Sequence, residues 1–142
     1  MMTIVLGVII VNFSLALCFV SSLLSKHKVA STVQIINAVF SGTIIPVFNN
    51  EILLEYYNVL HRPRFRFVED DIQNLLNAIR EHGVFTEQLT TGVDLPDPKD
   101  IVFYEVVMAK RDENAHLVTG NIKHFPKEPF IVTPNELLDI IT

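Results

Sequence analysis

The sequence contains one cysteine, and its first 50 residues contain no aspartate or glutamate. The single thiol of Cys18 allows no intramolecular disulfide bond. Without a second cysteine near a histidine, it also excludes a zinc site of the zinc-finger kind. All 16 acidic residues lie between Glu51 and Asp139. Any site built from carboxylates must therefore use the later part of the chain.

The composition is that of one globular domain, which we expect to span residues 1–142. Hydrophobic residues make up 49% of the chain and charged residues 19%, which excludes a disordered protein. The net charge of −5 does not attract nucleic acid, so RNA binding would need a local basic patch. The single cysteine fits a reduced compartment, and we expect a cytoplasmic protein.

Residues 4–24 form an uncharged, largely apolar run that has two interpretations. A run of about 20 apolar residues is long enough for a transmembrane helix. The same pattern is typical of a central parallel strand followed by a buried helix. β-branched residues are frequent in Ile4–Val11, which favours a strand. We therefore expect a first strand in a soluble domain, and a membrane anchor through residues 4–24 remains the alternative.

Apolar periodicity and capping residues predict alternating helices and strands in the rest of the chain. We expect helices at 31–41, 50–62, 70–82, 97–109 and from 134 onward, and strands at 43–48, 84–89, 115–119 and 130–133. This alternation predicts an α/β fold of three layers, in which a mostly parallel central sheet is flanked by helices.

Three local features of this pattern make sharper predictions. Asn50 is expected to cap the helix that follows it. Pro46 cannot donate a hydrogen bond within a sheet, which indicates a strand end or an edge strand. Thr133 and Glu136 form the sequence of a capping box, with Pro134 at the first helical position.

The polar residues with potential chemistry lie in segments that also have ordinary structural interpretations. Asp97 and Asp100 suit the start of a helix, where carboxylates satisfy free amides. Glu55 on an amphipathic helix is commonly solvated, and Asn121 after a glycine is a common turn residue. Ligands bind beyond the carboxyl ends of parallel strands, and residues 97–100 and 119–121 can reach such a crevice.

A row of arginines alternates with aromatic residues between the second and third predicted helices. Arg62, Arg64 and Arg66 could contact the phosphates of RNA. With Phe65 and Phe67 between them, they equally describe a strand with one solvated face. Both interpretations stay open on the sequence alone.

In this order and spacing, these segments resemble the PIN domain family, in the branch of toxin components from bacterial toxin–antitoxin pairs. The resemblance runs from about Val20 to the end of the chain. Its motifs are residues 20–25, Glu55-Tyr56, Val59-Leu60, Arg62-Pro63, 97–100, 118–121 and His124-Phe125-Pro126.

The resemblance implies a PIN-like fold and an endoribonuclease that depends on Mg²⁺ or Mn²⁺. Such hard cations prefer oxygen ligands. The family's metal-binding carboxylates match Glu55, Asp97 and Asp100. Many relatives have a further aspartate where this chain has Asn121, which completes the implied catalytic set. The residues implied to contact RNA are Arg62, Arg64, Arg66, Lys123 and His124.

One motif of the family is missing from this chain. The family begins with a strand that ends in Asp-Thr-Asn, and this aspartate is a principal metal ligand. Counting back from Ser21 without gaps puts Leu15 at that position, and matching the first strand instead puts Gly7 there. No alignment restores the ligand, because no carboxylate precedes Glu51.

The sequence therefore leaves three hypotheses about function. The first is a metal-dependent endoribonuclease that is weakened by the missing aspartate, with RNA as substrate and a cognate antitoxin as partner. The second is a non-catalytic PIN-fold protein that binds an antitoxin or RNA. The third is a membrane-anchored PIN protein. The resemblance leaves a homodimer open.

Overall fold

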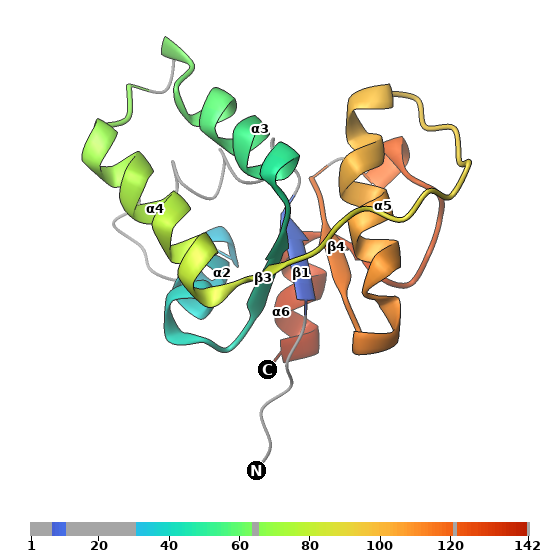
Figure 1. Cartoon of the computed structure of the whole chain (residues 1–142). Helices are drawn as coiled ribbons and strands as arrows, with labels where there is room; N and C mark the ends of the chain where they lie inside the picture. The colour runs from blue at the N-terminus through green and yellow to red at the C-terminus, as the bar shows by residue number, and fades with distance from the viewer. Residues whose placement is uncertain (1–6, 11–30, 64–65, 121, 142) are drawn as a thin grey trace.

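The computed structural model describes residues 7–10, 31–63, 66–120 and 122–141 (Figure 1). Within these ranges, five strands form one sheet in the order β3-β2-β1-β4-β5, and every pairing is parallel. The strands are β1 (Gly7–Ile10), β2 (Ile45–Phe48), β3 (Val84–Phe85), β4 (His116–Val118) and β5 (Ile131–Val132).

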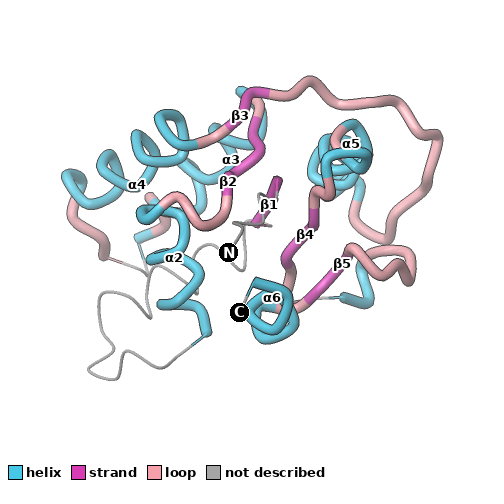
Figure 2. Tube along the Cα trace, turned by 90° about the horizontal axis from the view of Figure 1, so that it is seen from below, coloured by secondary structure: helices cyan, strands magenta, loops and turns pink. Residues whose placement is uncertain are grey.

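Helices pack on both faces of this sheet, as the predicted α/β fold requires. The helices described are α2 (Ser31–Ser41), α3 (Asn50–Leu60), α4 (Glu69–His82), α5 (Ile101–Ala109) and α6 (Pro134–Ile141). Figure 2 shows α5 on one face of the sheet and α2 and α6 on the other. α5 contacts β1, β2 and β4, while α2 contacts α4 and α6. The expected fold class is confirmed.

The helix α5 is buried around most of its circumference. Residues 102–107 are all buried, including Phe103, which has no exposed surface. A helix that is apolar on nearly all sides must be covered on nearly all sides, and α5 contacts the sheet as well as α3. α5 is therefore held in place by contacts with the sheet and with α3.

β1 lies at the centre of the sheet. It pairs with β2 through Gly7 and Val8 and with β4 through residues 8–10. The first strand expected within Ile4–Val11 is thus present at Gly7–Ile10. The other residues of the apolar run, 4–6 and 11–24, lie outside the described residues. Among the helices that the structure describes, none has the length and apolar character needed to cross a membrane.

The starts of α3 and α6 can be compared with the capping residues predicted from the sequence. The cap of α3 is Asn49, not Asn50: the Asn49 carboxamide oxygen accepts a hydrogen bond from the Ile52 amide at 2.8 Å. The prediction was wrong by one residue, because two consecutive asparagines give the same capping signal. The capping box before α6 is confirmed, since Thr133 N donates to Glu136 Oε1 and Glu136 N donates to Thr133 Oγ1.

Pro46 is the second residue of β2, near the start of the strand, so the predicted strand end is borne out; β2 is an interior strand, which excludes the alternative of an edge strand. β2 is flanked by β1 and β3, but β3 pairs only with Val47 and Phe48. Pro46, the second residue of β2, therefore needs no partner on the β3 side. Gly83, between α4 and β3, lies close to the backbone of Pro46. A Cβ atom there would be 2.4 Å from the Ile79 carbonyl oxygen and 2.7 Å from that of Pro46, so only glycine fits.

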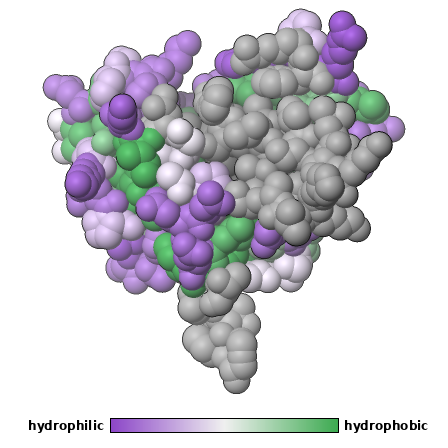
Figure 3. Space-filling model, turned by 180° about the vertical axis from the view of Figure 1, so that it is seen from behind, coloured by the Kyte–Doolittle hydropathy of each residue, from purple (hydrophilic) through white to green (hydrophobic). Residues whose placement is uncertain are grey.

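The surface of the described residues is mixed in polarity. Seen from behind in Figure 3, hydrophilic residues dominate and hydrophobic ones form small separate patches. Such a mixture is ordinary for a folded protein. The more informative surface is the hollow between α3 and α5.

Candidate active-site groove between α3 and α5

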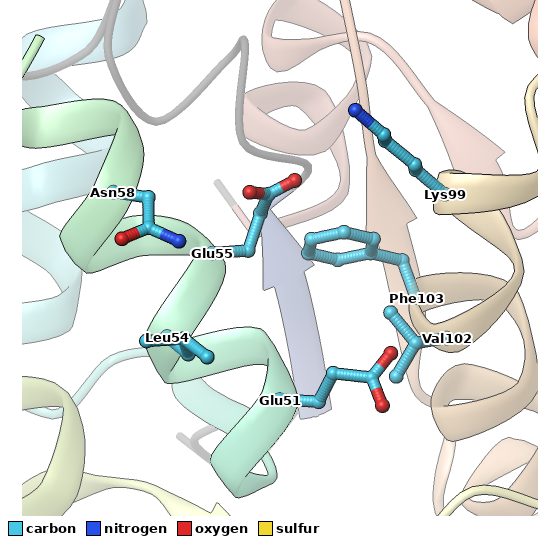
Figure 4. Close-up of a pocket in the computed structure, with 7 residues that line it drawn as sticks. All are labelled: Glu51, Leu54, Glu55, Asn58, Lys99, Val102 and Phe103. Carbon is cyan, nitrogen blue, oxygen red and sulfur yellow. The ribbon is translucent and has the colours of Figure 1, made fainter.

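A groove of about 240 Å³ lies between α3 and α5. The residues that line it are Glu51, Leu54, Glu55 and Asn58 from α3, and Lys99, Val102 and Phe103 from the opposite side. In Figure 4 the side chains of Glu55 and Lys99 extend into it from facing sides, near the tip of β1. The groove thus lies beyond the carboxyl end of the central strand, where parallel sheets bind ligands.

Asp100 is a buried carboxylate beside this groove. It ends the short 3₁₀ helix η2 (Pro98–Asp100) directly before α5, and only 7% of its surface is exposed. Burial raises the pKa of Asp100, and the charges of Asp97 and Glu55 raise it further. Burial disfavours the charged form and nearby carboxylates repel it. The fold therefore brings the charges of Asp97 and Glu55 close enough to Asp100 to act on its carboxyl group.

Among the described groups that act on Asp100, His124 alone stabilises its charge. The ring Nδ1 atom of His124, in the 3₁₀ helix η4 (Ile122–His124), lies 3.4 Å from Asp100 Oδ2. This contact lowers the pKa of Asp100, against the larger effects of burial and Asp97. The sequence predicted that His124 contacts RNA. The structure places its ring beside the carboxylate of Asp100.

Asp97 has the structural role that its sequence context allowed. It caps η2, with its Oδ1 accepting a hydrogen bond from the Lys99 amide at 3.0 Å, and Pro98 follows at the first helical position. Capping and a functional role are compatible here, since the same carboxylate acts on Asp100 through its charge.

None of the described residues that were predicted to contact RNA lines the groove. Arg62 and Arg66 are exposed and lie after the end of α3, and neither lines the groove. Arg66 has a positive φ of 53°, which a strand does not accommodate. The strand alternative for this row was therefore wrong where the structure describes it. Lys123 is exposed in η4, while Arg64 and Asn121 lie outside the described residues.

The structure decides one of the two alignments for the missing aspartate. Gly7 is the first residue of β1, which continues to Ile10. A carboxylate at Gly7 would therefore lie at the amino end of the strand, away from the groove, and this alignment was wrong. Leu15 lies outside the described residues.

Glu105 is a buried polar residue that the sequence analysis did not identify. It lies in the middle of α5 with 5% of its surface exposed. Its carboxylate accepts hydrogen bonds from Gln88 Nε2 at 2.8 Å, Thr91 N at 2.7 Å and Thr91 Oγ1 at 2.9 Å. The Thr91 amide, then the Gln88 side chain, lower the pKa of Glu105. The one available signal was a carboxylate within an otherwise apolar helix.

The described residues do not by themselves complete a site for a divalent cation. Within the ranges given above, no three His, Cys, Asp or Glu side chains are placed so that they could hold one. The charges of Asp97 and Glu55 act against the charge of Asp100, and an added positive charge would relieve this. That these three bind Mg²⁺ or Mn²⁺ stays a prediction.

The fold and the groove define an α/β protein with an acidic site beyond the carboxyl ends of a parallel sheet. A family model described as the PIN domain matches residues 16–123, and the chain belongs to this family. PIN domains are nucleases that typically depend on a metal. No curated protein and no solved structure matches the chain significantly. The matched residues begin after both Gly7 and Leu15.

Proposed function

We propose that this chain is a PIN-domain endoribonuclease with weak activity on single-stranded RNA. The observation that carries the proposal is the buried Asp100, whose charge is opposed by Asp97 and Glu55 beside a groove at the carboxyl end of β1. Carboxylates that repel each other in a cleft are typical of functional sites.

The weakness follows from the first 50 residues, which contain no acidic residue. Whatever follows β1 cannot supply the carboxylate that the family has there. Phosphodiester hydrolysis tolerates little misplacement of the reacting groups, and an error of about 1 Å can cost about a hundredfold in rate. An incomplete set of carboxylates is therefore expected to cleave slowly.

The test is cleavage of a short, end-labelled single-stranded RNA with Mn²⁺, with Mg²⁺ and with a chelator. We expect the wild type to cleave only slightly above the Asp100→Asn variant. Asp112→Asn, which changes an exposed aspartate in the 3₁₀ helix η3 (Arg111–Glu113), is the matched control. Rapid cleavage by the wild type that the chelator and Asp100→Asn both abolish would contradict the proposed weakness.

A repaired chain sharpens the same test. Replacing residues 15–17 by Asp-Thr-Asn restores the family motif at the remaining alignment, and we expect at least about a tenfold gain in cleavage. The control carries Asn-Thr-Asn at the same positions, so it differs only in the charge. Equal rates in the two variants would show that residue 15 is not the missing ligand position.

The second candidate function is a non-catalytic PIN protein that binds RNA or a cognate antitoxin. It is favoured by the same absence of acidic residues before Glu51. RNA binding without cleavage, in the wild type and in the repaired chain alike, would support it. The toxin role, the antitoxin, a homodimer and the cytoplasmic location are proposals that rest on the resemblance.

A further inference from the structure

The groove contains one cation that no described residue neutralises. Lys99 is exposed and lies opposite the carboxylates of Glu51 and Glu55 (Figure 4). In the described part of the chain, its ammonium group forms no ion pair within 4.0 Å, although Lys110, for example, pairs with Glu113 at 2.9 Å. A flexible ammonium beside an acidic wall is therefore left available for a ligand.

The position of Lys99 is set by its backbone. Its amide donates to Asp97 Oδ1 within η2, and η2 leads directly into the buried helix α5. The backbone is held by this capping bond, so the side chain can reach into the groove without contributing to the fold. Such a residue can be substituted with little structural consequence, which makes a ligand-binding role testable.

The rest of the groove suits a nucleobase. Val102 and Phe103 line the groove but are almost completely buried, so the apolar surface open to a ligand comes from Leu54, which is 58% exposed at the side of the groove. Asn58 offers an amide that hydrogen-bonds to no other described residue. Apolar surface with one amide is the combination that holds a base and bonds its edge.

The size of the groove favours the binding of a single residue of a longer polymer over the binding of a whole small molecule. Its volume of about 240 Å³ lies below the roughly 300–1,000 Å³ of pockets that enclose a whole small ligand. Two of its charged residues are carboxylates, so an anion can bind only at the Lys99 end. A single nucleotide of a longer RNA, with its phosphate at Lys99, satisfies both conditions.

We propose that Lys99 binds a backbone phosphate of single-stranded RNA, and that Leu54 and Asn58 hold the adjoining base. This inference rests on the proposed function, because it assigns the RNA-binding part of the same site. It adds Lys99 to the RNA contacts that the sequence predicted. Those of them that the structure describes do not line the groove.

The test measures binding alone, by fluorescence anisotropy of a labelled single-stranded RNA in the presence of a chelator at several KCl concentrations. We expect Lys99→Ala to weaken binding on the order of fivefold at low salt, and to reduce the slope of log K against log salt by about 0.7, which is one phosphate contact. Lys99→Arg should retain both values. The matched control is Lys127→Ala, which removes an exposed lysine outside the groove.

A second variant tests the base contact. Asn58→Asp replaces the amide donor by a carboxylate on the side of the groove opposite Lys99, with almost no change in shape, and we expect it to weaken RNA binding. Thermal unfolding of each variant should match that of the wild type, because both side chains lack structural partners among the described residues.

Two outcomes would overturn the inference: no RNA binding by the wild type, or equal effects of Lys99→Ala and Lys127→Ala. Its failure is distinguishable from that of the proposed function. Cleavage that depends on Asp100 but not on Lys99 would remove only the inference. Binding that depends on Lys99, without cleavage in any chain, would remove only the proposed enzyme.

Discussion

Two buried carboxylates, five positions apart at the start of and within α5, have opposite surroundings. Asp100 and Glu105 are 7% and 5% exposed. Glu105 accepts three hydrogen bonds, and its pKa is lowered. Asp100 has two carboxylates near it and one weak contact to His124, and its pKa is raised. The two carboxylates are thus similarly buried, but the surroundings of Glu105 stabilise its charged form and those of Asp100 destabilise it.

The difference separates a carboxylate with a structural role, Glu105, from the candidate site residue Asp100. Glu105 ties the segment that contains Gln88 and Thr91 to α5, and this segment leads on to η2. Among the residues that the structure describes, Asp100 receives no comparable set of donors, so a ligand with positive charge would be stabilised most at Asp100. Substitutions at the two positions should therefore have opposite consequences.

The largest effect on stability is expected for Glu105→Ala. The substitution leaves the Thr91 amide, the Thr91 hydroxyl and the Gln88 amide without their acceptor, and we expect a loss of about 3 kcal/mol in the free energy of unfolding. Denaturant titration measures it. The control is Glu113→Ala, which removes an exposed ion pair with Lys110 and should cost less than about 1 kcal/mol. Equal losses would mean that Glu105 is not an anchor.

Shape-preserving substitutions give the sharpest form of the comparison. Glu105→Gln should cost about 1–2 kcal/mol, because charged acceptors form the stronger bonds. Asp100→Asn removes a charge that Asp97 and Glu55 repel, so we expect the stability at pH 7 to be unchanged or increased. Both are measured by denaturant titration under the same conditions. A clear destabilisation by Asp100→Asn would show that its charge has partners beyond His124.

The pH dependence of stability should follow the lowered pKa of Glu105. A carboxyl group whose pKa is lower in the folded state than its ordinary value of 4.5 contributes stability that is fully present above that pH. The contribution is lost as the pH falls through the folded pKa. The difference in unfolding free energy between wild type and Glu105→Gln should therefore shrink below pH 4.5. A difference that stays constant down to pH 3 would contradict the assignment.

The smallest effect is expected for an exposed pair that links α3 to α4. His61 Nδ1 lies 2.7 Å from the Tyr57 carbonyl oxygen and Nε2 lies 2.6 Å from Glu69 Oε1. Only the charged ring can donate to both oxygens. The pKa of His61 is accordingly raised, first by Tyr57 and then by the side chain of Glu69.

This pair should contribute stability that is fully present below pH 6.5, the ordinary pKa of histidine, and lost as the pH rises through the folded value. Glu69→Gln should lower the pKa of His61 in an NMR titration. High salt should reduce the difference, because exposed charges are screened. Glu81→Gln, on the exposed side of the same helix, is the control, and a pKa of His61 that is the same in both variants would exclude the pair.

Most of the local structure could be predicted because local signals determine it. The apolar spacing of Ile72, Leu75, Leu76 and Ile79 predicted α4, and all four are buried. The capping box at Thr133 was confirmed in both of its hydrogen bonds. The errors were the choice between two adjacent asparagines at the start of α3, the strand alternative for the arginine row, and the alignment that placed the missing aspartate at Gly7.

The sequence by itself determined the helices and strands, the α/β class, the family and the carboxylates that could act together. These depend on residue types and on spacings of a few positions. The tertiary structure decided what surrounds each carboxylate. The donors to Glu105 lie 14 and 17 positions before it, and the groups that act on Asp100 come from α3, η2 and η4. A charge is stabilised or destabilised by neighbours in space, so only the packing of these elements distinguished the structural carboxylate Glu105 from the candidate site at Asp100.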